Sequence, residues 1–273
     1  MCSSARTTPA ALFIASRFPP KLPSVVRTIR TGVPQVVFED DDILVVDKPG
    51  GMVCHSAQRP EYGSLAEWLR ERGVRTPRMI NRLDRETSGL VVVAKDERAA
   101  RNLGQAVLRR EIEKQYLAIC WGTFEQANGV IDQPIAVGKN SVVYTKRVVD
   151  REAGKPSVTE FQVEQKLHGF TVVRLRPRTG RAHQLRVHLA WLGHPIVGDK
   201  VYGPDETLYL QFIERGVTTD MLKQLLLPRH ALHAECVSFH HPRHGQQCTV
   251  RAPGPEDMRT FIEEHSLPRQ ERG

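Results

Sequence analysis

Short apolar runs alternate with amphipathic stretches along the chain from residue 36 onward. Apolar and β-branched residues gather in runs of strand-like length at residues 36–38, 43–46, 90–93, 112–121, 170–175 and 232–239. The first two runs flank an acidic turn at residues 39–42, which predicts two strands joined by that turn.

Helical spacing occupies much of the remaining sequence. Ser64 and Glu67 have the spacing of a capping box, so a helix is expected from this point to about Gly73. Asp96 is placed to cap a second helix. Buried helical stripes are expected at Ala99, Leu103 and Val107, at Leu185, Leu189 and Leu192, and at Met258, Phe261 and Ile262. Because strand pairs are joined without regular helical crossovers, the order of elements predicts an α+β fold rather than a doubly wound sheet.

The first 35 residues differ in composition from the rest. They contain five basic residues and no acidic one, a bias that organelle transit peptides share. Five prolines interrupt any amphipathic helix there. We therefore predict a loosely structured or sheet-edge leader at residues 1–35, followed by one domain at residues 36–273. The expected location is cytoplasmic, with an organellar location as the alternative.

Composition restricts the possible partners and cofactors. The net charge of +8 favours a polyanionic partner, and no apolar stretch approaches the length of a membrane span. The five cysteines form no Cys-x-x-Cys pair, which argues against a disulfide framework or a zinc site. The glycine-rich loops of nucleotide-binding proteins are missing from the sequence. We expect no cofactor, no metal and a monomer.

One densely charged segment carries the candidate chemistry. Asp84 stands between Arg82 and Arg85, directly before the apolar run at residues 90–93. A carboxylate near guanidinium groups stays ionised at neutral pH. Without a Ser/His partner nearby in sequence, such a group suits a carboxylate nucleophile. The simpler alternative is an Asx turn before a strand.

Residues 81–90 (NRLDRETSGL) resemble the nucleophile segment of the RluA family of pseudouridine synthases. Asn81 stands where that family commonly has histidine. The resemblance extends in order from about residue 36 to about residue 242. Its further blocks are Asp47 to Gly51 (DKPGG), Lys114 to Ala118 (KQYLA), Thr179 to Leu189 (TGRAHQLRVHL), Gly193 to Asp199 (GHPIVGD) and Leu232 to Ala234 (LHA).

The resemblance implies a bent, mainly antiparallel mixed sheet flanked by helices and loops, with the active cleft across its middle. It implies isomerisation of uridine to pseudouridine in structured RNA, either ribosomal or transfer RNA, after the base is flipped out. Asp84 would attack either ribose C1′ or uracil C6, held charged by a salt bridge from Arg181. Tyr116 would stack on the base and transfer a proton, and Arg82 would enter the RNA helix.

Basic residues and a histidine are expected to contact RNA. The predicted contacts are Arg82, Lys48, Arg85, Arg178, His183 and Arg186. For the arginines of these clusters, the alternative is an ordinary solvated surface. The histidines have no Glu or Cys partner at metal-ligand spacing, so we assign them to polar support or RNA contacts.

Two other functions fit parts of the same sequence. The first is a catalytically inactive RNA-binding or RNA-folding protein on the same scaffold. The second is a glycosidase or base-excising hydrolase, which needs a second carboxylate. Glu86 is the candidate for that second group, although it lies only two residues from Asp84.

Overall fold

The computed structural model describes residues 32–55, 63–139 and 141–267. The predicted leader lies outside these residues except for its last four positions. Gln35, its final residue, begins the first strand, which forms one edge of the main sheet.

Within the described residues, ten strands form one sheet in the order β1-β2-β4-β11-β5-β10-β9-β6, with β12 beside β11 and β3 beside β4. All neighbours pair antiparallel except β4 and β11, which are parallel. The fold is therefore α+β with a mixed, mainly antiparallel sheet, as predicted. The strands are β1 (Gln35–Glu39), β2 (Ile43–Lys48), β3 (Arg78–Met79), β4 (Ser88–Ala94), β5 (Glu113–Trp121), β6 (Asn128–Asp132), β9 (Val158–Lys166), β10 (Phe170–Pro177), β11 (Leu232–His240) and β12 (Gln247–Arg251). A separate pair is formed by β7 (Ile135–Val137) and β8 (Arg147–Val149).

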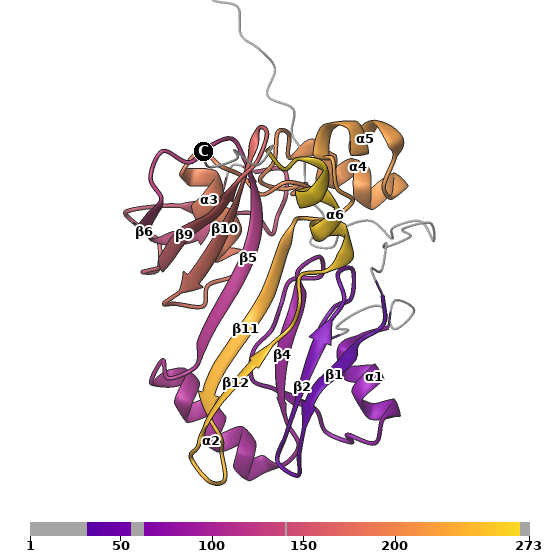
Figure 1. The fold of residues 1–273 in the computed structure, drawn as a ribbon, viewed down its shortest axis with the longest axis vertical. Helices are drawn as coiled ribbons and strands as arrows, with labels where there is room; N and C mark the ends of the chain where they lie inside the picture. Colours follow the sequence, from indigo (N-terminus) through magenta and orange to yellow (C-terminus); the bar gives the residue numbers. More distant parts are fainter. Residues whose placement is uncertain (1–31, 56–62, 140, 268–273) are drawn as a thin grey trace, which may run out of the picture.

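The long strands β5 and β11 run through both halves of the molecule (Figure 1). The pairing register shifts between Ala234 and Cys236 on β11, and between Val172 and Val173 on β10. Such irregularities bend a strand and increase its twist. Strands β5 and β11 and the segment that precedes β4 each supply residues to the pocket described below.

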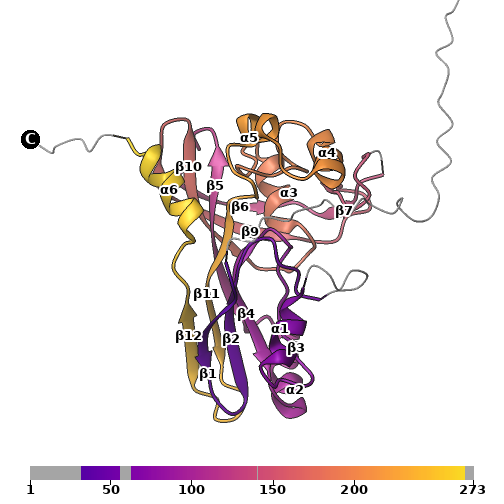
Figure 2. The same cartoon turned by 90° about the vertical axis from the view of Figure 1, so that its right-hand side faces the viewer.

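Six helices surround this sheet in the described part of the chain: α1 (Leu65–Glu71), α2 (Glu97–Leu108), α3 (Gln184–Trp191), α4 (Thr207–Arg215), α5 (Thr219–Leu225) and α6 (Glu256–Glu264). Helices α4 and α5 lie together at one end of the molecule, and α2 lies at the other (Figures 1 and 2). No helix among the described residues is both long enough and apolar enough to cross a bilayer.

Both faces of the sheet are covered at its β2 and β4 strands. Leu44 and Val46 join a large cluster with residues of α1, α3 and α6, whereas Ile43 and Val45 pack in a second cluster with residues of α2 and β12. Burial on both faces explains why these strands are continuous apolar runs rather than alternating ones.

The predicted caps are confirmed, and one predicted core position is wrong. Ser64 and Glu67 form the reciprocal capping box of α1, and the Asp96 side chain accepts from Ala99 N at the start of α2. Val107, expected in the buried stripe, is 40% exposed, and Ala106 is buried in its place. The last turn of α2 rotates Val107 toward the pocket described below.

Candidate active site

The Asp84 segment is a loop between β3 and β4 whose backbone is fixed on both sides. The Cys54 thiol donates to the Leu83 carbonyl at 3.6 Å and accepts from the Leu83 amide at 3.4 Å. The Leu83 side chain is buried in the core. After the loop, Gly89 has φ +112°, and a Cβ there would meet the backbone of Ala234 at 2.4 to 2.8 Å. Only glycine allows β4 to approach β11 this closely.

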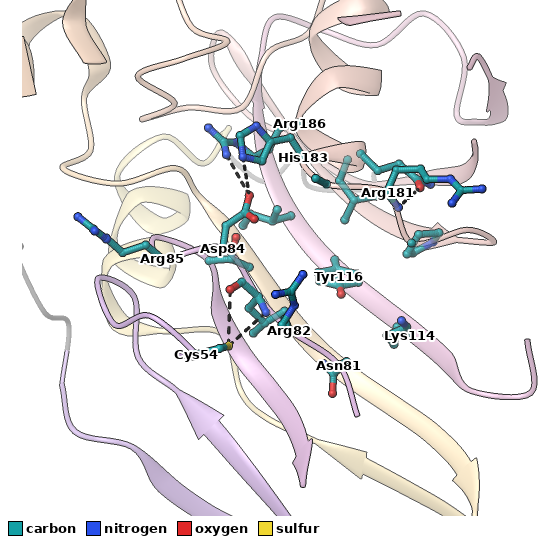
Figure 3. Close-up of a pocket in the computed structure, with 18 of the residues that line it drawn as sticks. Cys54, Asn81, Arg82, Asp84, Arg85, Lys114, Tyr116, Arg181, His183 and Arg186 are labelled. Atoms are coloured by element: carbon teal, nitrogen blue, oxygen red, sulfur yellow. Dashed lines mark hydrogen bonds and ion pairs between the residues drawn. The ribbon is translucent and has the colours of Figure 1, made fainter. Parts of the chain in front are cut away.

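Arg186 connects the Asp84 carboxylate to a buried aspartate. Its Nη1 donates to Asp84 Oδ2 at 2.9 Å (Figure 3). Its Nε and Nη2 donate to Asp199 at 2.6 and 2.9 Å. Asp199 also accepts from the amides of Val201 and Tyr202. These contacts, with Arg186 as the leading favourable one, hold the pKa of Asp199 well below its usual range despite burial.

The predicted salt bridge between Arg181 and Asp84 is wrong. The Arg181 amide donates to Gln184 Oε1 at 3.0 Å, and its side chain donates to the Pro156 carbonyl at 3.3 Å. Its guanidinium points away from Asp84, and the residue is exposed (Figure 3). Gln184 fixes the backbone before α3. Arg186, five positions after Arg181, reaches the Asp84 carboxylate instead.

His183 occupies the turn that sets this direction. It has the left-handed backbone at φ 57° just before α3, and its Nδ1 lies 2.9 Å from the Tyr202 hydroxyl. Its Nε2 lies 4.0 Å from Asp84 Oδ2. Burial, with Arg186 nearby, lowers the pKa of His183 to about 4, so the ring is neutral at pH 7. The residue therefore borders the Asp84 carboxylate without adding a positive charge.

Tyr116 lies on β5 across the pocket from the Asp84 loop (Figure 3). Its ring is 8% exposed. Burial and the nearby Asp84 carboxylate raise the pKa of Tyr116 above its ordinary value, so the phenol is protonated at neutral pH.

Lys48 requires a second correction, because it was expected to contact RNA. The side chain is fully buried, and Nζ donates to the carbonyls of Pro49, Met52 and Arg85. Burial lowers its pKa to about 8. Lys48 thus holds the loop that follows Asp84 from the inside, and no RNA group can reach it in this structure.

The other predicted RNA contacts have different surroundings. Arg82 and Arg85 are exposed and line the pocket, with the Arg85 guanidinium directed away from Asp84 (Figure 3). Arg178 is exposed but already forms a bidentate ion pair with Glu160 at 2.7 and 3.0 Å. Arg186 is buried and pairs with the Asp84 carboxylate rather than facing solvent.

Asn81, at the position where histidine was the expected family residue, completes the edge of β4. Its Nδ2 donates to the Leu90 carbonyl at 3.0 Å, and its Oδ1 accepts from the Val92 amide at 2.9 Å. An amide side chain offers this donor and acceptor together, as a neighbouring strand would.

A pocket of about 570 Å³ extends from Asp84 along β5. This volume is within the usual range for ligand sites. Among the described residues that line it, Asp84 is the single carboxylate, and one of its oxygens, Oδ1, has no hydrogen bond to the described residues. The wall also carries Arg82, Arg181 and Lys114. The arrangement offers one oriented carboxylate oxygen in a cationic pocket.

A possible metal-binding group lies elsewhere in the described chain. Asp40, Asp42 and His241 have their ligand atoms within 4.8 Å of one another. Both Asp42 oxygens already accept from arginines, and His241 Nε2 lies 2.8 Å from Asp40. None of the three lines the pocket, so they are structural ion pairs rather than part of the site.

Three residues of the site had no role in the sequence interpretation. Asp199 and Lys114 stand inside blocks quoted for the family resemblance, so the signal was present without an assigned function. Tyr202, whose hydroxyl contacts His183, lies outside those blocks. Its position emerges only when α3 and the segment after Asp199 pack together.

Known proteins resemble the chain over most of its length. The family described as RNA pseudouridylate synthase matches residues 42–191. A Bacillus subtilis protein named uncharacterized RNA pseudouridine synthase YlyB is 36% identical over 84% of this chain and 71% of its own length. Ribosomal large subunit pseudouridine synthase D of Vibrio vulnificus is 37% identical over 85% of this chain and 73% of its own.

Solved structures agree with these sequence relatives. Human RNA pseudouridylate synthase domain containing 1 superposes with a TM-score of 0.64 at 28% identity, over 85% of this chain and 86% of that one. The segment that matches the family, residues 42–191, contains every described residue that lines the pocket except Leu232. The chain therefore belongs to the RluA family of RNA pseudouridine synthases, isomerases that convert uridine to pseudouridine in RNA.

Proposed function

We propose that this protein isomerises specific uridines of large-subunit ribosomal RNA to pseudouridine, with Asp84 as the nucleophile. The observation that carries the proposal is the Asp84 carboxylate itself, which Arg186 holds through Oδ2 while Oδ1 faces the pocket without a hydrogen bond to the described residues. The ribosomal substrate is proposed from the name of the Vibrio relative. A transfer RNA stem-loop is the second candidate substrate.

The reaction breaks the C1′–N1 bond, turns the base and forms a C1′–C5 bond. N1 gains a proton and C5 loses one, so no redox equivalent or nucleotide energy is consumed. Asp84 attacks either C1′ or C6 of the flipped nucleotide. Arg186 keeps the attacking carboxylate in one orientation, which is worth several kcal/mol when the reacting atoms are correctly placed.

Tyr116 packs against the target base in this proposal. The raised pKa of its phenol makes a resting phenolate base unfavourable, so its first role is to position the ring. Tyr116→Phe separates the two functions. Turnover close to wild type would assign packing alone, whereas a loss of about 100-fold would assign proton transfer to the hydroxyl.

Arg82 and Arg181 are exposed cations of the pocket wall. We propose that Arg82 enters the space left by the flipped base and that Arg181 contacts the backbone. Exposed cations in such positions offset the few kcal/mol that base flipping costs.

A tritium-release assay tests the function. RNA with tritium on C5 of uridine loses that label only when C5 becomes bonded to ribose. Wild-type protein should release tritium from large-subunit ribosomal RNA, and Asp84→Asn should bind the same RNA with similar affinity and release none. Tritium release by Asp84→Asn near the wild-type rate would refute the nucleophile.

The same assay separates the two competing functions. An inactive RNA-binding protein would retain all label, and a base-excising hydrolase would produce free uracil. The hydrolase is disfavoured because Glu86 does not line the pocket and its carboxylate accepts from Lys200 at 2.6 Å. Mapping pseudouridine in total RNA from cells with and without the gene then identifies the target positions.

A further inference from the structure

Lys114 lines the pocket beside Tyr116 but has no part in the chemistry described above. The two residues stand two positions apart on β5, so their side chains project to the same face of the strand (Figure 3). At a rise of about 3.3 Å per residue, their Cα atoms are about 7 Å apart. Lys114 therefore lies one nucleotide-sized step along the pocket from the proposed base position.

The Lys114 ammonium is half-buried without a counter-charge. Among the described residues it forms no hydrogen bond and no ion pair, and desolvation alone lowers its pKa. The buried cations elsewhere in the described chain are compensated. Lys48 donates to three carbonyls, Lys200 to Glu86 and the Pro228 carbonyl, and Arg229 to Asp257.

No described residue of the pocket wall accepts a hydrogen bond from the Lys114 ammonium. Asp84 is the single carboxylate among the described lining residues; its Oδ2 accepts from Arg186, and neither of its oxygens forms an ion pair with Lys114. The amide of Asn81 is committed to the backbone of β4, and the neighbouring Val107 and Ile80 are apolar. An ammonium partly removed from water without an acceptor is costly, unless a ligand brings the negative charge.

We propose that Lys114 binds a phosphodiester group of the RNA strand next to the target uridine. The inference rests on the proposed function, because it places the target base between Asp84 and Tyr116. An RNA strand carries one phosphate for each nucleotide, so a base at Tyr116 brings a neighbouring phosphate toward Lys114. The ammonium then acts as an anchor that fixes the strand along β5 while the base is flipped.

Salt dependence of binding measures such a contact directly. Each neutralised phosphate contributes about 0.7 to 0.9 to the slope of log affinity against log salt concentration. The measurement uses Asp84→Asn protein, which cannot turn over, and a short stem-loop transcript containing a mapped target uridine. Adding Lys114→Gln should lower the magnitude of the slope by about 0.7 to 0.9, the contribution of one phosphate, and weaken binding roughly five- to tenfold at physiological salt.

Two matched variants exclude other causes. Lys166→Gln removes the same charge from an exposed site at the end of β9, outside the pocket, and should leave the slope nearly unchanged. Lys114→Arg keeps the charge and should restore the slope. A methylphosphonate in place of the contacted phosphate should weaken binding of the parent protein but cause no further loss with Lys114→Gln.

The outcomes separate this inference from the proposed function. Equal slopes for the parent and Lys114→Gln would overturn it, as would an equal loss with Lys166→Gln, which would indicate only general electrostatic attraction. A contact to a uracil carbonyl would also leave the slope unchanged and would overturn it. The proposed function is judged independently, by whether wild-type protein releases tritium.

Discussion

Replacing Arg186 by lysine tests the geometry around Asp84, the proposed nucleophile. The guanidinium makes three hydrogen bonds to two carboxylates, with Asp199 accepting two and Asp84 accepting one. A lysine ammonium keeps the positive charge beside the buried Asp199 but is a point donor without the planar fork. It can hold one Asp199 oxygen, and it then leaves Asp84 without its orienting partner.

The magnitude follows from the bonds that are lost. One charge-assisted bond to the fully buried Asp199 is worth about 1.5 to 3 kcal/mol. The bond to Asp84, whose side chain is 34% exposed, is discounted for solvent to about 0.5 to 1 kcal/mol. A total near 2 to 4 kcal/mol should lower the melting temperature by about 4 to 16 °C. Loss of the Asp84 orientation should slow turnover about 100-fold.

Thermal unfolding and single-turnover tritium release measure these two effects, and a binding titration checks RNA affinity. Affinity should stay close to wild type, because Arg186 is buried and its guanidinium is engaged by two carboxylates. Arg181→Ala is the matched control. Within the described part of the chain, its exposed side chain donates only to the Pro156 carbonyl, so stability should change by less than about 0.5 kcal/mol and saturated turnover by less than a few-fold.

The opposite pattern would refute this reasoning. A folded Arg181→Ala protein without activity, together with Arg186→Lys at the wild-type rate, would show that Arg181 orients the nucleophile in solution. Loss of RNA affinity in Arg186→Lys at a temperature where it is folded would also contradict the structure, because it would assign the buried guanidinium to substrate binding.

Three further predictions concern the loop, the sheet edge and pH. Lys48→Met should lower the free energy of unfolding by about 2 to 4 kcal/mol, because three carbonyls lose their donor. The dependence of RNA affinity on salt concentration should stay unchanged. Normal stability with weaker RNA binding would contradict this prediction. Asn81→Ala should cost about 1 to 2 kcal/mol in thermal unfolding, and an unchanged melting temperature would show that the two bonds to β4 contribute nothing. Burial lowers the pKa of His233 to about 4. Between about pH 6.5 and pH 4 the unfolded chain therefore binds a proton that the folded chain does not, and the free energy of unfolding falls by up to about 3 kcal/mol as pH decreases. His233→Gln should therefore flatten the decline measured by denaturant unfolding at pH 7 and pH 4.5, and an identical decline in the variant would exclude His233 as its source.

The sequence was most informative where local spacing fixes structure. The Ser64 and Asp96 caps bond backbone amides three positions away, so their effect can be inferred from a few neighbouring residues. Several elements with weak or short patterns were not predicted, including β6, β9, α4 and α5. The prediction that Val107 is buried was wrong for a related reason. Helical spacing alone does not show how the last turn of a helix packs against its neighbours.

The site residues were also predictable only in part. The family motifs pointed to Asp84 and Tyr116 as site residues, and in the structure both line one pocket. The choice between Arg181 and Arg186 was wrong, because it depends on a left-handed turn at His183 and on a contact between residues 102 positions apart. The catalytic roles of these residues remain proposals that the variants above test.

By itself the sequence determined the α+β class, the strand and helix nuclei, and the loop that carries Asp84, because periodicity, caps and motifs act over a few residues. Only the tertiary structure decided that Lys48 points inward, that Arg186 bridges Asp84 and Asp199, and that Lys114 lines the pocket without a partner among the described residues. Whether a charged side chain is buried, paired or open to a ligand depends on what distant segments pack against it.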